Sequence, residues 1–391
     1  MIHRAKKQNP DSVVVAVGCY VQTAADQIEN DPYIDLAIGN NRKKDIVSIV
    51  EKYLKCRGED KTLQGTTIPD IAHETEYEEM QLSHTAEHTR AYIKIQDGCN
   101  QFCSYCVIPY ARGRVRSRRP ENVIAEVERL AEAGYKEVVL TGIHLSSYGL
   151  DFRGETYNGN YEHSEDLLSL IEQIHEMDKI ARIRLGSLEP RVVTEDFAKR
   201  LAQLPKVCPH FHLSLQSGSD SVLKRMNRRY TCEEFEEGVR ILRKYFENPA
   251  ITTDVITGFP GETEEEFAQT RDFLKKISFF EMHVFPYSRR EGTAAASMPG
   301  QLTEKEKKER SSVLLDMDRE RSLVYRKAHL GKEMPVLFEQ TQKIGGEMYF
   351  VGHTTNYMKV AMKSEEDLVN KEMLCRLADM LDEETLFAQK N

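Results

Sequence analysis

Apolar and polar positions follow two different periods along most of this chain. Between residues 90 and 286, short apolar runs are followed by stretches in which apolar residues recur every three or four positions. The runs predict buried strands, and the longer period predicts amphipathic helices between them. The predicted strands are 92–96, 137–141, 182–187, 210–215, 251–256 and 282–286.

The helical stretches between these strands determine how the sheet is built. They cover residues 120–133, 165–175, 194–203, 232–246 and 262–276. Strand–helix alternation implies parallel pairing with right-handed crossovers. A closed barrel of this kind needs eight units, whereas this chain offers six, so we expect an α/β fold in the form of an open, partial (β/α)6 barrel. Chemistry in such folds gathers where the strands end.

Two smaller parts flank the predicted barrel. Apolar runs at 12–18 and 33–39, with helical periodicity at 45–54, predict an N-terminal α/β piece with too few elements for a complete doubly wound domain. Residues 56–89 are polar and acidic, which is typical of a linker. On the other side of the barrel, residues 301–328 form a long, charged helical stretch.

The last part of the chain changes to a period of two after Gly331. This alternation predicts short antiparallel strands that close into a compact β-barrel of OB-like size. The predicted strands are 334–339, 348–352, 358–361 and 373–377.

Length and composition limit the class of protein. A chain of 391 residues is long enough for two or three domains with sizeable cores. Its net charge of −9 does not by itself indicate a nucleic-acid binder. No apolar run reaches membrane-spanning length, and the first residues lack the apolar stretch of a signal peptide. Eight cysteines without an even, close spacing fit a reducing compartment, so we expect a cytoplasmic protein with no membrane partner.

Three cysteines, Cys99, Cys103 and Cys106, stand in the run GCNQFCSYC just after the first predicted barrel strand. Thiolates bind iron–sulfur clusters, and three of them on one loop hold three irons of a 4Fe–4S cube and leave the fourth iron open. A cofactor such as S-adenosylmethionine needs an open iron for chelation and one-electron reduction. A structural zinc site would need a second ligand pair, and a disulfide framework suits a short secreted chain, so both alternatives are disfavoured.

Polar and small residues end four of the predicted strands. They are Thr141 and Gly142, Ser187 and Glu189, Ser214 and Gln216, and Gly258 and Gly261. A nucleoside cofactor needs polar partners and, where backbone approaches it closely, small residues. Glu189 and Gln216 can receive a methionyl ammonium or sugar hydroxyls, and the two last glycines can let backbone pass beside an adenine. Each tip alone is more typical of a cap or turn, but four in register with the cysteine loop predict cofactor binding.

Tyr105 lies inside the cysteine loop, just before the last cysteine. Two roles are equally consistent with that position: the ring packs the loop, or it flanks the adenine of the cofactor. Cys19 follows the first predicted strand, where a helix is expected to begin. Helix N-termini lower thiol pKa values and suit metal ligation, although a lone half-buried cysteine is the more common case.

A cluster of arginines follows the cysteine loop. It consists of Arg112, Arg114, Arg116, Arg118 and Arg119. No Asp or Glu lies between Cys99 and Pro120. Because such a basic strip beside a reaction centre is not compensated locally, it predicts contact with phosphate rather than a merely solvated face. Arg290, near the expected barrel mouth, either contacts a carboxylate of substrate or cofactor or is solvated.

These motifs resemble those of the radical S-adenosylmethionine methylthiotransferases. The segments that carry the resemblance are DGCNQFCSYCVIPYARGRVRSR, GSLEPRVV, HFHLSLQSGSDSVLKRMNRRYT, TTDVITGFPGETEEEF and HVFPYSRREGT. The resemblance implies a partial N-terminal methylthiotransferase domain with linker at 1–75, a radical core at 85–325 and a C-terminal TRAM domain at 326–391. The YARGRVRSR and SLEP forms resemble the bacterial branch that acts on N6-threonylcarbamoyladenosine beside the anticodon of tRNA.

The resemblance also implies a mechanism. The cysteine trio would hold a cluster that cleaves S-adenosylmethionine to a 5′-deoxyadenosyl radical, with electrons from a donor that the sequence does not identify. That radical would abstract hydrogen from C2 of the modified adenine, and an auxiliary 4Fe–4S cluster would deliver a sulfur methylated by a second S-adenosylmethionine. An unactivated aromatic C–H resists acids and nucleophiles, so the cofactor must supply the radical.

One departure from the family pattern concerns the auxiliary cluster. Family members bind it with three N-terminal cysteines, and Cys19 matches only the third of them. The opening of this chain resembles the middle of the family's N-terminal domain. We therefore expect an N-terminally truncated chain that assembles the radical cluster, holds the auxiliary one poorly, and does not reach full methylthiolation.

Two other functions are compatible with the sequence. One is methylthiolation of an aspartate in a ribosomal protein, because residues 331–391 contain seven Lys and Arg against eleven Asp and Glu, which favours a basic protein partner. The other is a catalytically incomplete RNA-binding remnant, which the intact cysteine motif disfavours. We expect tRNA and S-adenosylmethionine to be the partners.

Overall fold

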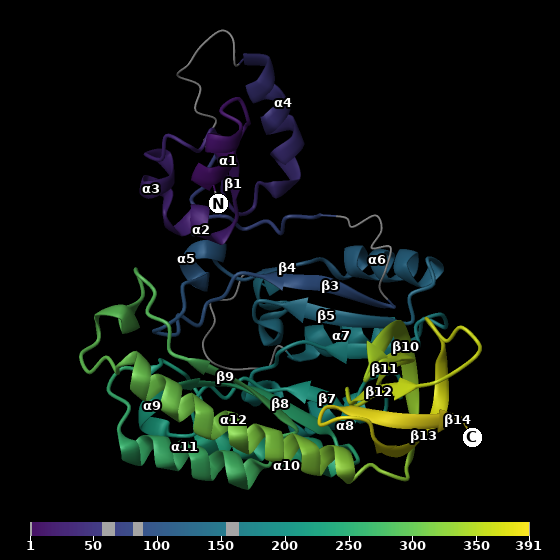
Figure 1. Ribbon diagram of the computed structural model, residues 1–391. Coiled ribbons are helices and arrows are strands. Elements are labelled where there is room, and N and C mark those ends of the chain that lie inside the picture. Colours follow the sequence, from purple (N-terminus) through teal and green to yellow (C-terminus); the bar gives the residue numbers. More distant parts are fainter. Residues whose placement is uncertain (1, 57–66, 81–88, 154–163, 391) are drawn as a thin grey trace.

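The computed structural model describes residues 2–56, 67–80, 89–153 and 164–390. Three units follow one another along the chain: a small N-terminal α/β unit, a large central α/β unit and a C-terminal barrel (Figure 1). None of the helices in these ranges is long and apolar enough to span a membrane.

The N-terminal unit is built around two parallel strands, β1 (Val15–Val17) and β2 (Leu36–Ile38). Its helices are α1 (Ile2–Gln8), α2 (Cys19–Thr23), α3 (Ala25–Glu29), the 3₁₀ turn η1 (Lys43–Asp45) and α4 (Ile46–Cys56). The small core contains Val21, Ile28 and Ala37. The predicted small α/β piece is confirmed, with shorter strands than the apolar runs suggested.

The central unit contains six parallel strands in two sheets. The first sheet holds β3 (Arg90–Asp97), β5 (Glu137–Gly142) and β6 (Arg182–Leu185), and the second holds β7 (His210–His212), β8 (Ala250–Thr257) and β9 (Glu281–Pro286). Isolated bridges, such as Leu188 to Leu213, join the two sheets between β6 and β7. The six strands therefore form one open, partial barrel, as expected; β4 (Arg116–Ser117), antiparallel to β3, was not predicted.

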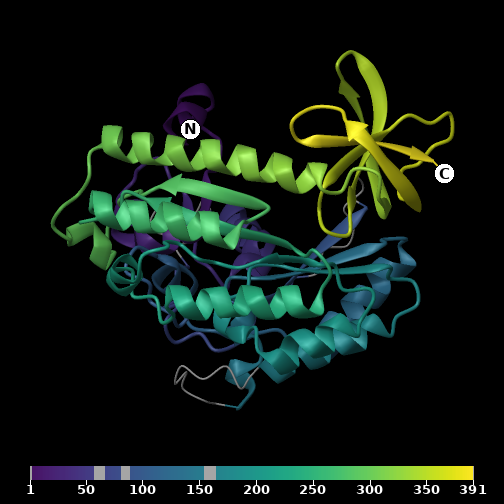
Figure 2. The same ribbon diagram turned by 90° about the horizontal axis from the view of Figure 1, so that it is seen from below.

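Helices cover the outside of this partial barrel (Figures 1 and 2). Two of them begin at a reciprocal capping box, which Thr231 and Thr263 each form with a Glu three residues later. The helices are α5 (Ile108–Arg112), α6 (Pro120–Glu132), α7 (Ser164–His175), α8 (Glu195–Ala202), α9 (Asp220–Arg225), α10 (Cys232–Tyr245) and α11 (Glu264–Ile277), with 3₁₀ turns η2 (Leu145–Ser147), η3 (Leu150–Arg153), η4 (Pro190–Val192) and η5 (Ala294–Ser297).

A long helix, α12 (Glu304–Lys327), runs beside β9 and leads to the C-terminal barrel (Figure 2). The barrel is closed in the order β10–β11–β12–β14–β13. Its strands are β10 (Glu333–Ile344), β11 (Glu347–Thr354), β12 (Lys359–Met362), β13 (Glu372–Met380) and β14 (Thr385–Lys390). The expected barrel is present, but β14 was not predicted, and because β14 pairs parallel with β12 the barrel is not wholly antiparallel.

The C-terminal barrel closes the amino ends of the central strands. Tyr357, between β11 and β12, stacks on His210 with ring centroids 4.8 Å apart and lies under the Arg184 guanidinium at 4.7 Å. The buried Arg182 side chain donates to Glu372 at 2.6 Å and to the Pro335 carbonyl at 3.0 Å. These contacts fix the barrel against the end of the sheet opposite to the predicted site.

Residues 67–80 do more than connect two units. Thr67 bridges to Ile38 of β2, Ile71 is buried, and the Tyr77 hydroxyl donates to the Lys94 carbonyl of β3 at 2.7 Å. This part of the predicted linker is therefore packed against both the N-terminal and the central unit, while residues 57–66 and 81–88 lie outside the described residues.

Candidate active site

The cysteine loop begins where β3 ends, and its first turn requires glycine. Gly98 has φ +70°, and a Cβ at this position would lie 1.8 Å from the Arg114 carbonyl oxygen. The Asp97 carboxylate accepts from the Gly98 amide at 2.9 Å, and the Cys99 amide donates to the Gly113 carbonyl at 3.0 Å. The loop is therefore tied at its start to the chain that leaves it.

The three predicted cluster cysteines line one pocket of about 160 Å³ at the carboxyl ends of the central strands. Cys99 and Cys103 are buried, and Cys106 is half-buried. Burial raises the pKa of the Cys99 thiol to about 12, and it also raises the pKa of Cys106. A metal that binds here must therefore displace protons from these thiols.

Five of the predicted cofactor-binding residues meet the cysteines in this pocket. They are Tyr105, Ser187, Glu189, Ser214 and Gln216. Gln216 has φ +70°, and its backbone amide donates to the Asp254 carbonyl at 2.9 Å, which turns the tip of the β7 segment toward β8. Tyr105 packs edge-on against Phe259, with centroids 6.4 Å apart, while it also lines the pocket.

Glu189 is a buried carboxylate held by several partners. Its Oε2 lies 3.2 Å from His144 Nε2, and its Oε1 accepts from Arg191 Nε at 2.7 Å. The Gln101 side-chain amide donates to Oε2 at 3.3 Å. Burial acts to raise the pKa of Glu189, but His144 and the neighbouring arginines outweigh it and hold the pKa below its usual value.

A half-buried guanidinium, that of Arg228, lies beside the cysteine loop. Its Nη1 donates to Cys103 Sγ at 3.3 Å, and its Nε donates to the Tyr230 hydroxyl at 3.0 Å. Although burial disfavours the charge, Tyr230 and Cys103 hold the pKa of Arg228 well above its ordinary value. This fixed cation offsets negative charge that develops on the thiols.

Sequence reasoning missed Gln101, His144 and Arg228, which line the same pocket. Gln101 and Arg228 stood inside the motif segments GCNQFCSYC and RMNRRYT, so their proximity to the cysteines was the available signal. His144 follows the β5 tip, and its backbone amide donates to Gln96 Oε1 at 2.8 Å, a contact between two strand ends that the sequence does not reveal.

Four predicted cofactor-binding residues do not line the pocket. Thr141 donates from Oγ1 to the Ile93 carbonyl at 3.3 Å, and Gly142 packs against the Gln96 side chain. A Cβ on Gly258 would lie 2.3 Å from Lys307 Cγ, and the Gly261 amide donates to the Gly300 carbonyl at 2.8 Å. The two later glycines thus serve the packing of the turn after β8 against the segment around α12.

The arginine strip is not the exposed, uncompensated surface that was expected. Arg116 and Arg118 are 1 % and 4 % exposed. Arg118 pairs with Glu79 at 2.8 Å and with Glu126. Carboxylates from the packed linker and from α6 neutralise Arg118, and Arg116 Nη1 donates to the Arg114 backbone carbonyl at 3.3 Å. The expectation that these two arginines form an exposed strip that contacts phosphate is therefore not supported, because both side chains are buried and already have partners.

The other predicted substrate-binding arginines differ in exposure. Arg114 is exposed and lies over the Phe102 ring at 4.7 Å, and Arg290 is also exposed. Arg112 is half-buried and donates to Asp97 at 3.4 Å and, from Nε, to Cys19 Sγ at 3.1 Å. Of the strip, Arg114 and Arg119 remain available to a partner in solution.

Cys19 lies at the contact between the N-terminal unit and the cysteine loop. Beyond the bond from Arg112, its Sγ lies 3.6 Å from Asn40 Nδ2, which also donates to the Ala111 carbonyl at 2.6 Å. Arg112 and Ala111 belong to α5, which begins two residues after Cys106. One short helix therefore connects the Cys19 thiol to the pocket.

The pocket fits an iron–sulfur cluster that is left open for a cofactor. Three thiols on one loop supply the soft ligands that iron prefers, and the Arg228 guanidinium beside Cys103 compensates their charge. Glu189 and Gln216 line the same pocket and offer acceptors for an amino group or hydroxyls.

Comparisons with known proteins agree with this geometry. The model of the Radical SAM superfamily matches residues 93–274. The chain is 40% identical to a threonylcarbamoyladenosine tRNA methylthiotransferase of Bacillus subtilis over 95% of this chain and 79% of the relative. It is 36% identical to a tRNA-2-methylthio-N(6)-dimethylallyladenosine synthase of Moorella thermoacetica, over 96% of this chain and 82% of the relative.

The fold comparison is consistent with the sequence comparison. The solved radical S-adenosylmethionine methyltransferase TsrM of Kitasatospora setae matches with a TM-score of 0.55 at 18% identity, over 73% of this chain and 59% of that chain. At that identity the match shows a shared fold. Together with the tRNA-modifying relatives, it shows that the chain belongs to the radical S-adenosylmethionine tRNA methylthiotransferase family.

Proposed function

We propose that this protein adds a 2-methylthio group to N6-threonylcarbamoyladenosine next to the anticodon of tRNA. The observation that carries the proposal is the pocket at the strand ends that three thiols line together with Glu189 and Gln216. We infer the substrate from the names of the relatives. The Bacillus subtilis relative acts on threonylcarbamoyladenosine, and it is more similar in sequence to this chain than the Moorella relative, whose product carries a dimethylallyl group.

Family membership implies a 4Fe–4S cluster and S-adenosylmethionine. We assign the cluster to Cys99, Cys103 and Cys106, and the methionyl ammonium of the cofactor to Glu189. When bound, the cluster supplies the electron with which S-adenosylmethionine is cleaved. Ser187, Ser214 and Gln216 offer hydrogen-bonding groups for the remaining polar groups of the cofactor, and Tyr105 forms one wall.

The protein prepares two charges for this cofactor. Glu189 is kept ionised by His144 and Arg191, so it meets an ammonium without first losing a proton. Arg228 places a positive charge beside Cys103 and so offsets the negative charge that a bound cluster brings to the pocket. Glu189 is buried and Arg228 is half-buried, and their partners hold both side chains in place before the cofactor arrives.

Cys19 contributes, in this proposal, one thiolate to an auxiliary cluster. Its contact with Arg112 supports that role, because the guanidinium places a positive charge beside the sulfur. Among the described residues of the N-terminal unit, the other cysteine is Cys56, at the end of α4. The other ligands of such a cluster therefore do not come from the neighbourhood of Cys19 that the structure describes.

We further propose that the C-terminal barrel is a TRAM domain, with the central unit at 85–325 as the radical core and residues 1–75 as the methylthiotransferase domain. Exposed Arg114, near the pocket, and Arg290, beyond β9, are the arginines that we assign to substrate. The acidic composition of the barrel is the one feature that favours a basic protein as the methylthiolated partner instead.

Nucleoside mass spectrometry of tRNA tests the assignment. Cells that lack this gene should lose the 2-methylthio group from threonylcarbamoyladenosine and keep the unmethylthiolated nucleoside. Re-expression of the gene should restore the group, and a Cys103→Ala copy should not. The contrary result is that methylthiolation of threonylcarbamoyladenosine stays unchanged, while a methylthio group is lost from dimethylallyl-type adenosine or from a ribosomal aspartate. That result would assign the enzyme to the other substrate.

A further inference from the structure

Three metal-ligating side chains gather on the second sheet of the partial barrel, outside the cysteine pocket. They are His212 on β7, Asp254 on β8 and His283 on β9. Side chains at alternate positions share one face of a strand. Ser214 and Gln216 line the cysteine pocket, so His212 lies on the same face one alternate position further from the strand tip.

The three metal-ligating side chains already lie close together. Asp254 and His283 are direct partners in the β8–β9 register, and β8 also pairs with β7. One ligand atom from each of the three side chains lies within 4.8 Å of those of the other two. His212 Nε2 is 3.4 Å from Asp254 Oδ2, and the two histidine rings are nearly parallel, with centroids 5.8 Å apart.

A hydrogen bond on the far side of the His212 ring fixes its orientation. Its Nδ1 lies 3.1 Å from the Thr252 hydroxyl, whereas Nε2 is buried and has no hydrogen-bond partner in the described structure. A buried nitrogen without a partner is costly. The 3.4 Å to Asp254 is longer than the roughly 2.7–2.9 Å of a charge-assisted hydrogen bond. A cation between the two atoms would satisfy both, and a second hydrogen bond on the other ring nitrogen is typical of histidine ligands.

We propose that His212, Asp254 and His283 bind one divalent transition-metal ion. Two imidazoles and one carboxylate suit Zn²⁺, Mn²⁺ or Fe²⁺, in contrast to the all-thiol set of the cysteine pocket. Metal–ligand distances of about 2.0–2.2 Å place donor atoms roughly 3–3.5 Å apart. The His212–Asp254 pair meets that spacing, and His283, which is exposed, closes the set by a side-chain rotation.

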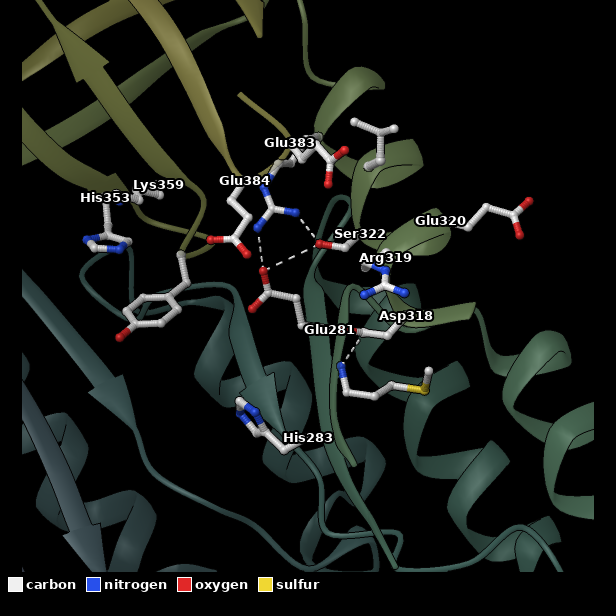
Figure 3. Close-up of a pocket in the computed structure, with 14 residues that line it drawn as sticks. Glu281, His283, Asp318, Arg319, Glu320, Ser322, His353, Lys359, Glu383 and Glu384 are labelled. Carbon is white, nitrogen blue, oxygen red and sulfur yellow. Dashed lines mark hydrogen bonds and ion pairs between the residues drawn. The ribbon is translucent and has the colours of Figure 1, made fainter. Parts of the chain in front are cut away.

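An entry path reaches this site from the other side. His283 lines a cleft of about 550 Å³ between β9, α12 and the C-terminal barrel, and Figure 3 shows its ring extending from β9 at that cleft. Five carboxylates line the cleft, from Glu281, Asp318, Glu320, Glu383 and Glu384. They outnumber the cationic side chains there, so the local potential favours entry of a cation.

Mn²⁺ binding followed by electron paramagnetic resonance tests the proposal on the full chain with its cluster oxidised. Free aqueous Mn²⁺ gives a six-line signal that is lost when the ion binds to the protein, and the oxidised cluster gives no signal of its own. Mn²⁺ prefers oxygen and nitrogen ligands and therefore does not compete with iron for the thiolates. We expect one Mn²⁺ per chain. His283→Ala and Asp254→Asn should each weaken binding at least about tenfold.

The matched control is His353→Ala, which removes a histidine from the same cleft but outside the trio. It should bind Mn²⁺ as the unaltered protein does. Iron and sulfide contents and circular dichroism should be equal in all variants, and zinc retained after gel filtration should fall only in the trio variants. The proposal is overturned if the unaltered protein neither binds Mn²⁺ at millimolar concentration nor retains more zinc than His283→Ala. It is also overturned if His353→Ala weakens Mn²⁺ binding as much as the trio variants do.

Discussion

The two ends of the central partial barrel treat buried polar groups in opposite ways. At the amino ends, Arg184 donates to Glu137 at 2.7 Å and lies over Tyr357, so the charges are satisfied by the protein itself. At the carboxyl ends, the three thiols and Glu189 line a pocket. The comparison shows that one scaffold holds a closed structural network and an open chemical site at opposite ends of the same strands.

The largest effect is expected at the open end. Cys103→Ala removes one of the three thiols that we assign to the cluster, so the protein should bind little iron and release no 5′-deoxyadenosine when it is reduced with S-adenosylmethionine. Cys56→Ser, outside the motif, should keep both properties. Iron analysis and chromatography of the nucleoside measure them, and a Cys103→Ala protein with full iron and full cleavage would remove this cysteine from the site.

At the closed end, Glu137→Gln should cost stability instead of chemistry. It leaves the buried Arg184 without its charged partner, which typically costs about 3–5 kcal/mol. Urea unfolding of the reconstituted protein should show that loss, while iron content per folded chain stays unchanged. An unaltered unfolding midpoint would show that the amino-end network is not a determinant of stability.

Glu189→Gln should weaken cofactor binding at the open end. A hydrogen bond to a charged group contributes about 1.5–3 kcal/mol, so the KM for S-adenosylmethionine should rise roughly 10–150-fold. Cluster content should not change. A KM equal to that of the unaltered enzyme would separate Glu189 from the cofactor.

The pH dependence of this interaction follows from the lowered pKa of Glu189. Because its folded-state pKa is below the ordinary value, the carboxylate is ionised throughout the neutral range. Its contribution is complete above the usual carboxyl pKa and is lost only as the pH falls through the lowered value. Cofactor affinity measured between pH 6 and pH 8 should therefore show no titration of this carboxylate; a titration that Glu189→Gln abolishes would contradict the assignment.

The smallest effect is expected for the exposed Arg114, and it concerns tRNA binding. Arg114→Ala should weaken tRNA binding and reduce the slope of log affinity against log salt by about one. Arg118→Ala is the matched comparison: it should lower stability, because it leaves Glu126 without its partner in the buried pair. Filter binding at several salt concentrations distinguishes the two. An unchanged slope for Arg114→Ala would remove this residue from the interface with tRNA.

The central fold and the cysteine loop could be predicted because their signals are local. Apolar runs located six strands, and Cys99, Cys103 and Cys106 lie within eight residues of one another. The state of Arg118 could not, because its partner Glu79 comes from a distant segment. His144 was missed for the same reason, since only the folded chain brings it within 3.2 Å of Glu189.

The turn after β8 illustrates a different limit. Its glycines looked like cofactor contacts because small residues permit close approach, but the neighbour that approaches Gly258 is Lys307 of α12. The glycines in the sequence indicate that some group approaches the backbone closely at this turn, but they do not identify that group. The fifth barrel strand, β14, was overlooked because its apolar residues, Leu386 to Ala388, stand in succession instead of alternating with polar ones.

Pulsed electron paramagnetic resonance of the reduced protein with isotopically labelled S-adenosylmethionine tests most directly whether the thiol-lined pocket holds the reacting cofactor. The account predicts hyperfine coupling between the cluster spin and ¹⁵N in the methionyl amino group, and loss of that coupling in Cys103→Ala. A fully assembled cluster that shows no coupling to the labelled cofactor would contradict it.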